Sequence, residues 1–248
     1  GPPFDEPKAS PGSTSATFQH NSEKWGSRAI RIFKDILPGA ESLSRMEMIA
    51  KRVDGLRDTA GFRIAPLKVH RNAVNLPTTT LPAIEMPWIE GASIHRCARE
   101  AAKKGDRGTL RELASRAEMM ADGMERHGFD HGDISGSNII VDHRGDLWLI
   151  DPDTLRHRSI EDDDFHLREV GHEHYAHSRR SSETWESCLY RFPLEVMIVS
   201  LNGLSSDPDL VMRYGNDDNS LLFKREDLDD PYGSDLFKEL CKLVGKRA

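Results

Sequence analysis

Apolar residues recur at helical spacing in four segments of the chain. The clearest is 106–128, where they return every three or four positions and form one stripe. The stripe consists of Leu110, Leu113, Ala114, Ala117, Met120, Ala121 and Met124. Similar spacing predicts helices at 40–56, 190–204 and 234–244, and Pro193 suits the first turn of the third. We expect these stripes to pack in a core.

Other segments show the alternation or the short apolar runs that are typical of strands. In 25–35, alternation places Ala29, Arg31 and Phe33 on one face and Ile30 and Ile32 on the other. The segment 81–94 reads as an apolar strand that leads into a turn containing glycine. In 138–150, two apolar runs flank Asp-His-Arg-Gly-Asp, which predicts a hairpin whose turn uses Gly145.

The order of these elements predicts the fold class. Strands and one helix come first, and mostly helices with one hairpin follow, which indicates an α+β chain with two lobes. Residues 1–24 are rich in Pro, Ser, Gly and charge, so they form either two short strands around a turn or a disordered leader. Residues 154–190 are polar and rich in histidine, and we expect a long loop with short helical pieces, of the kind that is often functional.

Composition and charge exclude several classes of protein. The 248 residues carry a formal net charge of -7, which argues against a general nucleic-acid-binding protein. No apolar run approaches the ~18 residues that cross a bilayer, and no leader marks the chain for export. The three cysteines (Cys97, Cys188 and Cys241) are odd in number and far apart, which favours free thiols in a reducing, cytoplasmic compartment.

Polar residues at regular intervals surround the predicted hairpin. "HGDISGSN" (131–138) precedes it and "DPD" (151–153) follows it. Because a hairpin runs out and back, it returns Asp151 beside Asn138. Magnesium prefers a few hard oxygen ligands of this kind, and phosphoryl transfer also needs a carboxylate that orients the incoming hydroxyl, for which we choose Asp133. Asp153 either adds to the metal site or caps the following turn.

This pattern resembles the catalytic loop and metal-binding segment of the protein-kinase-like superfamily. There, His-x-Asp is followed after four residues by Asn and, beyond a hairpin, by Asp. "HGD" and "DPD" are closest to aminoglycoside phosphotransferases and to various bacterial kinases. The resemblance implies a bilobal fold, with a flexible leader at 1–11, a small β-rich N-lobe at 12–88 and a larger helical C-lobe at 89–248. It also implies ATP and Mg²⁺ as cofactors, with Mn²⁺ as a substitute.

The resemblance also assigns nucleotide-binding residues in the expected N-lobe. "RAIRIF" resembles the strand that carries the phosphate-binding lysine, which places Arg31 there, with Lys34 as the fallback cation on the opposite face. Glu47, or alternatively Glu41, would be the ion-pair partner of Arg31. "EMPWIEG" resembles the hinge. The implied set is Arg31, Glu47, Met86 as gatekeeper, Pro87 and Ile89 as adenine contacts, and Gly12 in the phosphate loop.

The resemblance narrows further with "EVGHEHYAHSRR" (169–180). It is similar to a Gly-His-x-x-Tyr-x-His activation segment in a group of bacterial kinase-like proteins. Members are often encoded or fused beside von Willebrand-type and metal-dependent phosphatase domains, which implies such partners. The motif says less about the substrate, for which we expect a protein. Charge and the apolar runs described above predict no nucleic-acid partner and no membrane. We expect His172 and His177 to shape this segment by hydrogen bonding. A zinc site of His166, His172, His174, His177 and Cys188 is the alternative.

Less specific interpretations remain beside these. Asp133 and Asn138 are also common turn formers and helix caps, and Arg31 would be ordinary as a solvated strand residue. Three functions stay open: a protein Ser/Thr kinase, a small-molecule kinase of the antibiotic type, and a pseudokinase that acts as a scaffold. The lysine that many Ser/Thr kinases carry two residues after the catalytic Asp is replaced by Ser135. The presence of Asp133, Asn138 and Asp151 argues against the pseudokinase. The C-terminal part shows no large acidic insertion that would bind an aminoglycoside, which argues against the small-molecule kinase, so we favour the protein kinase.

Overall fold

The computed structural model describes nine parts of the chain and divides it into two compact units. The parts are 15–22, 26–33, 40–56, 63–75, 77, 80–160, 171–177, 190–215 and 220–245. Unit 1 comprises residues 1–57 and 64–89, and unit 2 comprises residues 58–63 and 90–248. The predicted leader at 1–11, Gly12 and Lys34 lie outside the described residues. The protein is of the α+β class, as the sequence predicts.

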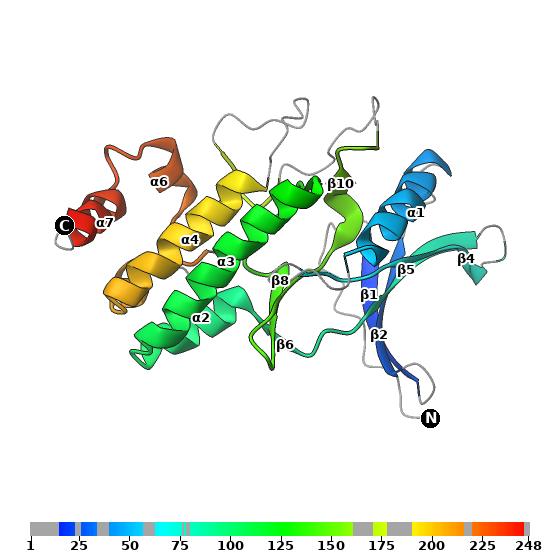
Figure 1. The fold of residues 1–248 in the computed structure, drawn as a ribbon, viewed down its shortest axis with the longest axis horizontal. Coiled ribbons are helices and arrows are strands. Elements are labelled where there is room, and N and C mark those ends of the chain that lie inside the picture. Colours follow the sequence, from blue (N-terminus) through cyan, green and yellow to red (C-terminus); the bar gives the residue numbers. More distant parts are fainter. Residues whose placement is uncertain are drawn as a thin grey trace. The chain divides into compact units, whose positions relative to one another are not determined.

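Unit 1 contains an antiparallel sheet and one helix. The sheet has the order β1-β2-β5-β4, with β1 at Ser15–Ser22, β2 at Gly26–Phe33, β5 at Thr80–Pro87 and β4 at Lys68–Asn75. Helix α1 (Ala40–Asp54) packs against β4 (Figure 1). Its predicted apolar stripe is largely buried, since Leu43, Met46, Ile49 and Val53 are at most 8% exposed.

Unit 2 is built around helices and a small sheet. The helices are α2 (Ile94–Lys103), α3 (Arg107–His127), α4 (Arg191–Ser206), α5 (Leu210–Arg213), α6 (Arg225–Asp229) and α7 (Asp235–Gly245). The sheet has the order β3-β9-β8-β6, from β3 (Arg63–Ile64, where the chain passes from unit 2 to unit 1), β9 (Leu147–Leu149), β8 (Ile139–Asp142) and β6 (Gly91–Ser93). A separate ribbon pairs β7 (Phe129–His131) with β10 (Leu155–His157), which follows the 3₁₀ turn η1 (Pro152–Thr154).

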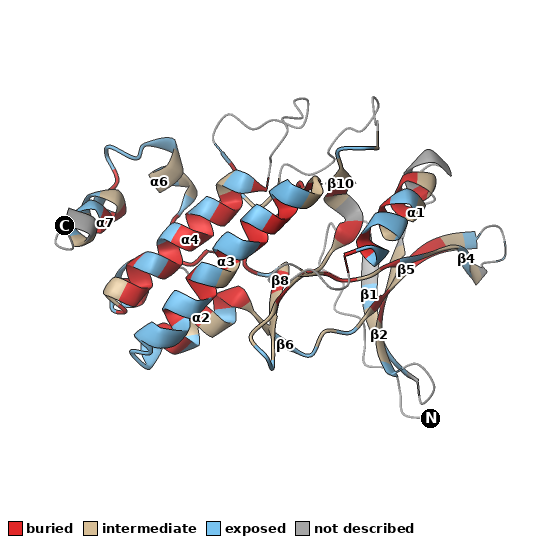
Figure 2. Ribbon diagram, viewed as in Figure 1, coloured by how far each residue is buried: buried red, intermediate tan, exposed pale blue. Residues whose placement is uncertain are grey.

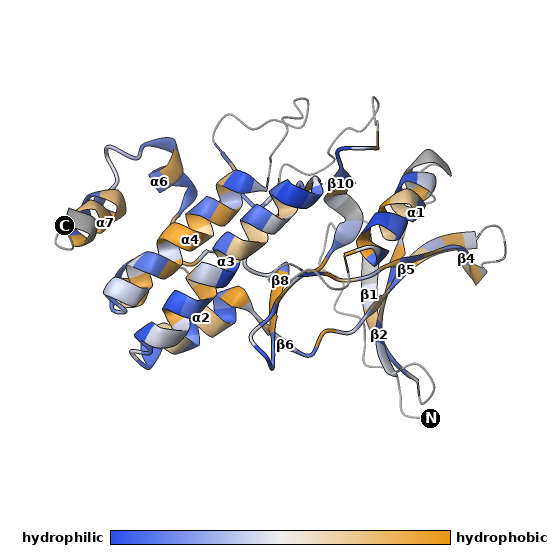
Figure 3. Cartoon of the chain, viewed as in Figure 1, coloured by the Kyte–Doolittle hydropathy of each residue, from blue (hydrophilic) through white to orange (hydrophobic). Residues whose placement is uncertain are grey.

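The core of unit 2 lies between α3 and α4. All seven residues of the stripe predicted in 106–128 are buried, and α4 is apolar over most of its length (Figure 3). Figure 2 shows buried positions along the sides of α3 and α4 that face each other. Burial of these side chains is the main stabilising contribution to this unit.

The ends of α3 explain why it begins and ends where it does. The Asp106 carboxylate accepts a hydrogen bond from the N–H of Thr109 at 3.0 Å and so caps the first turn. At the other end, Gly128 adopts a left-handed conformation (φ 68°), which terminates the helix at no steric cost to glycine. The chain then turns directly into β7, the strand that leads to His131.

The predicted elements at 25–35, 40–56, 106–128, 138–150, 190–204 and 234–244 are confirmed as β2, α1, α3, the β8–β9 hairpin, α4 and α7. Gly145 does supply a positive φ (80°) in the hairpin turn. Within the described residues, Cys97 and Cys241 are free thiols. No described helix is long and apolar enough to span a membrane.

Candidate active site

His131 connects the two polar segments that flank the hairpin. It is the last residue of β7 and is 1% exposed. Its Nδ1 accepts the N–H of Asp133 at 3.2 Å, and its Nε2 lies 2.7 Å from the carbonyl oxygen of Asp151. Because Nδ1 accepts, the proton of the neutral ring is on Nε2, which donates to Asp151. One imidazole therefore fixes the backbone at both predicted acids.

The carboxylate of Asp133 is held by a donor on each oxygen. The Nδ2 group of Asn138 donates to Oδ2 at 3.1 Å and also to the Asp133 carbonyl at 2.7 Å. The main-chain N–H of His172 donates to Oδ1 at 3.1 Å. Each carboxylate oxygen has a second lone pair. Asp133 is therefore oriented and can still accept a hydrogen bond from a substrate hydroxyl.

Asn138 lies at one end of the hairpin and Asp151 at the other. The N–H of Ile150 donates to the Asn138 carbonyl at 2.9 Å, which closes the hairpin at its open end. Within the described residues, both side-chain hydrogen bonds of Asn138 use Nδ2. Its amide oxygen Oδ1 is therefore free to meet a cation. The hairpin thus brings Asn138 and the residue before Asp151 together, as the sequence predicts.

Asp151 has a strained backbone. Its φ of 62° and ψ of 74° are left-handed, and among the described residues it is the one non-glycine with a positive φ. Such a conformation costs about 1–2 kcal/mol for a residue with a Cβ. Strain of this kind persists only where the surroundings impose it, and it clusters at functional sites. Here the hydrogen bond from His131 and the buried Pro152 that follows hold the backbone.

Asp153, the third residue predicted to bind metal, lies in η1, and its side chain is outside the described set. Among the residues that the structure describes, no group of three or more His, Cys, Asp or Glu side chains is arranged to hold a metal ion. A magnesium ion suits Asn138 and Asp151 nevertheless, because Mg²⁺ takes one or two protein ligands and completes its shell with water and phosphate oxygens.

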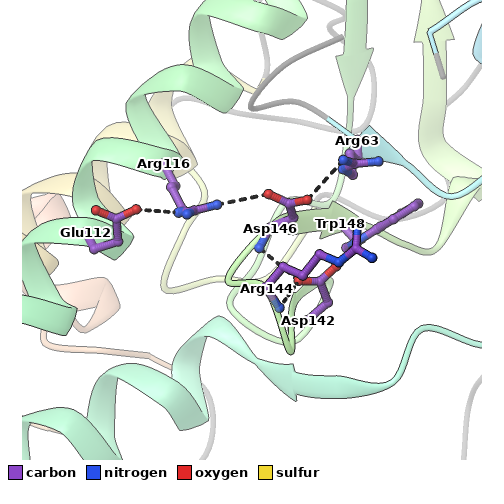
Figure 4. A network of polar contacts seen from close by, with 7 residues as sticks. All are labelled: Arg63, Glu112, Arg116, Asp142, Arg144, Asp146 and Trp148. Carbon is purple, nitrogen blue, oxygen red and sulfur yellow. Dashed lines mark hydrogen bonds and ion pairs between the residues drawn. The ribbon is translucent and has the colours of Figure 1, made fainter. Parts of the chain in front are cut away.

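A network of charged residues supports the far end of the hairpin (Figure 4). The carboxylate of Asp146, in the turn, forms ion pairs with Arg116 of α3 and Arg63 of β3. The nitrogen–oxygen distance is 3.0 Å in each pair. Arg63 also lies over the ring of Trp148 at 5.2 Å from the centroid. Asp142 accepts the indole N–H of Trp148 at 3.0 Å. The turn is therefore tied to α3, which fixes the hairpin that carries Asn138 and Asp151.

The pKa of Asp142 is lowered in this network. Burial alone would raise it, but the indole of Trp148 and the N–H groups of Arg144 and Asp146 donate to its carboxylate and outweigh burial. Two of these donors come from the hairpin turn, and Trp148 comes from β9. Ionised Asp142 therefore stabilises the turn conformation.

The predicted nucleotide-binding residues of the first lobe lie in unit 1. Arg31 lies in β2 opposite Ile84, and Met86 is buried opposite Ala29. Since cross-strand partners share a face, Arg31 and Met86 lie on the same face of the sheet, which confirms the predicted alternation in β2. Pro87 ends β5, and Ile89 follows it. Their roles in binding stay predictions.

Glu47 forms its ion pair with a residue that the sequence did not indicate. Arg71 of β4 donates from Nε and Nη2 to the two carboxylate oxygens at 2.8 and 2.9 Å. This pair lowers the pKa of Glu47 through the hydrogen bond from Arg71. The expected pairing with Arg31 is therefore replaced by a bidentate pairing between α1 and β4. The side chain of Glu41, the alternative partner, is not described.

The histidines of 171–177 contact protein groups. His174 Nδ1 accepts the N–H of Arg225 at 3.1 Å. The ring of His172 packs edge-on against Tyr175, and that of His177 against Phe192. His172 shapes the segment by hydrogen bonding, as expected. The described residues contain no zinc cluster, and two members of that alternative, His166 and Cys188, lie outside them.

Contacts of Asp130, His131 and His172 that the sequence did not indicate organise the site. His131 was recognised only as part of the motif, and Asp130 was not recognised at all. Asp130 Oδ1 accepts the N–H groups of His131 and Tyr190 at 2.8 and 2.9 Å, which joins the site to the start of α4. The contact of His172 with Asp133 spans 39 residues. His131 lies in the motif and Asp130 directly beside it, whereas the contact of His172 with Asp133 had no signal in the sequence.

Comparison with known proteins adds no family assignment. No protein-family model matches the chain, and no curated protein matches it. The contacts of residues 130–160 and 171–177 are therefore the basis for a function.

Proposed function

We propose that the chain is an ATP- and magnesium-dependent phosphotransferase with a bilobal protein-kinase-like fold, which transfers the γ-phosphate to a serine or threonine hydroxyl of a protein. One observation carries the proposal. A single buried imidazole holds the amide of Asp133 and the carbonyl of Asp151, and Asp151 is kept in a strained left-handed conformation. Strained backbone of this kind clusters at functional sites, which supports a functional role for this turn.

The roles of the residues follow from their contacts. Asp133, oriented by Asn138 and His172, accepts the hydrogen bond of the substrate hydroxyl and directs its oxygen toward the phosphorus. Asn138 Oδ1 and the Asp151 carboxylate would hold Mg²⁺ or Mn²⁺, which would neutralise the charge on the phosphate oxygens when bound. Arg31 is proposed to bind the α and β phosphates, and Met86, Pro87 and Ile89 to surround the adenine.

Ser135 supports a second candidate, a small-molecule kinase. It stands where many Ser/Thr protein kinases have a lysine, it is 4% exposed, and its Oγ contacts Ser137 Oγ at 2.8 Å. Residue 135 therefore supplies no cation to the site. We favour the protein substrate because residues 171–177 resemble the activation segment of the bacterial kinase-like group. We also propose a cytoplasmic location, and partners with phosphatase or von Willebrand-type domains.

The test is phosphate transfer from labelled ATP with magnesium to casein-type proteins and to aminoglycosides. We expect label on protein. Asp133→Asn should lower transfer by about two to four orders of magnitude and leave ATP affinity nearly intact, because a group that orients the hydroxyl acts in the transition state. Asp151→Asn should abolish the magnesium-dependent part of ATP affinity measured by calorimetry. The matched control is Asp122→Asn, on the exposed side of α3.

The outcomes separate the three functions. Label on the aminoglycoside alone selects the small-molecule kinase. Magnesium-dependent ATP binding without transfer to any acceptor selects the pseudokinase. Wild-type protein that neither binds ATP nor transfers phosphate refutes the proposal, and so does an Asp133→Asn variant with normal turnover.

A further inference from the structure

The segment 171–177 reaches the catalytic carboxylate through its second residue. Gly171 has a φ of 78°, a conformation that glycine adopts without strain. The next N–H, that of His172, then donates to Asp133 Oδ1 at 3.1 Å. The main chain of His172 therefore lies directly beside the group that receives the substrate hydroxyl. Its side chain is attached at the same point.

The imidazole of His172 is held in place by its own segment. Its Nδ1 lies 3.4 Å from the N–H of His174 and accepts from it. Its ring meets Tyr175 edge-on, with centroids 6.1 Å apart, and the Tyr175 N–H donates to the His172 carbonyl at 2.9 Å. Tyr175 is itself 2% exposed and anchors the segment. With Nδ1 accepting, the neutral ring carries its proton on Nε2 and presents one donor.

Burial favours the neutral ring of His172. Burial lowers its pKa, and the neighbouring His174 and His95 act in the same direction. The carboxylates of Asp133 and Glu173 oppose this without reversing it. At neutral pH, His172 is thus an uncharged hydrogen-bond donor that remains only partly buried.

Position 135, where many Ser/Thr protein kinases have a lysine, is a serine in this chain. Ser135 points toward Ser137 and is buried, so it offers nothing to the phosphate. We propose that His172 Nε2–H takes over this task and donates a hydrogen bond to the transferring phosphoryl group. This inference rests on the proposed phosphotransferase function. No bond to the ring is made: the hydroxyl oxygen gains the phosphoryl group, ADP leaves, and the hydroxyl proton passes to Asp133.

The test compares two substitutions of similar size. His172→Gln keeps an N–H donor, whereas His172→Leu keeps the apolar contact with Tyr175 and has no donor. Loss of one preorganised donor lowers turnover by about 10²- to 10³-fold. We therefore expect kcat to fall about 10²-fold or more in His172→Leu and by less than about tenfold in His172→Gln. The KM for ATP should change little in either, because the donor acts on the transition state.

The control is His177→Leu, in the same segment but exposed, which should retain wild-type turnover. If the role of His172 is packing alone, kcat of His172→Leu will equal or exceed that of His172→Gln. The inference about His172 is then wrong, but the proposed phosphotransferase function is not affected. If the wild-type protein transfers no phosphate, both fail together. Should His172→Leu not fold, His172→Met, which also lacks a donor and fills the space flexibly, takes its place.

Discussion

Replacing Asp151 by glycine and by alanine separates its backbone strain from its carboxylate. Both variants lose the charged group, so both should lose magnesium-dependent ATP binding. They differ only in how they accommodate a φ of 62° and a ψ of 74°. Alanine meets the left-handed penalty of about 1–2 kcal/mol. Glycine avoids it but loses about 0.5–1 kcal/mol more through its freedom in the unfolded chain.

The free energy of unfolding of Asp151→Gly should therefore exceed that of Asp151→Ala by about 0.5–1 kcal/mol. For a chain of this size, that difference corresponds to a shift in Tm of about 1–4 °C. Alanine usually gives a more stable protein than glycine, so the order expected at residue 151 is reversed. Gly108 in α3 provides the matched control. That residue is exposed, and a Cβ there would approach nothing closer than an Asp106 carboxylate oxygen at 3.4 Å. Gly108→Ala should therefore stabilise the protein by about 0.4–1 kcal/mol.

The assay is urea unfolding of the two Asp151 variants and of the Gly108 pair under one set of conditions. Opposite signs at the two positions support a left-handed backbone at residue 151 in solution. If Asp151→Ala is as stable as Asp151→Gly, residue 151 does not hold that conformation, and the argument for a functional turn loses its basis.

Three further predictions concern other parts of the molecule. Asp146→Ala should lower the free energy of unfolding by about 1 kcal/mol, because it leaves two arginines without their shared carboxylate; Arg96→Ala, in an exposed helical pair, should have no measurable effect on urea unfolding. Between pH 7.5 and 5.5 the wild type should lose stability, since the unfolded chain protonates His172 more readily than the folded one; His172→Gln should flatten this slope, and equal slopes would contradict it. Arg31→Ala should lower the affinity for ATP about ten- to a hundredfold and that for adenosine little, because a charge-assisted contact with phosphate contributes about 1.5–3 kcal/mol. Calorimetry with both ligands tests this, and an equal loss of affinity for both would show that Arg31 does not contact the phosphates.

The elements that the sequence predicted are those that bury one face, on which large apolar side chains repeat. Helix α3 is an example, because Leu110, Leu113 and Met120 repeat on one face. Helix α2 escaped notice because its buried face is made of Ile94, His95 and small alanines, which give little contrast with its charged side. The edge strand β4 alternates too weakly, with three of its central residues exposed. The ribbon of β7 and β10 has three residues a strand, too few for any periodicity.

In the site, contacts between residues close in the sequence could be predicted, whereas contacts between distant segments could not. Asn138 and Ile150 come together because the hairpin is local, and the sequence contains both its strands and its glycine turn. The donation from His172 to Asp133 depends on how a segment 39 residues away returns, which no pattern within either segment specifies. The pairing of Glu47 was misassigned for a similar reason. Its actual partner, Arg71, lies on the strand that the sequence did not reveal.

The antiparallel pairing of β8 and β9 has a consequence for insertions and deletions. Ile139 pairs with Leu149, Ile140 with Trp148 and Val141 with Leu147, so each step away from the site adds one residue on each strand. Lengthening the hairpin by one residue on both strands would move the turn outward and leave Asn138 and Asp151 where they are. A single residue inserted into one strand would turn its side chains to the opposite face of the sheet. The number of residues between Asn138 and Asp151 can therefore change by two, one on each strand, without separating them. A sequence alignment that requires a fixed interval between these residues would miss related chains with a longer or shorter hairpin.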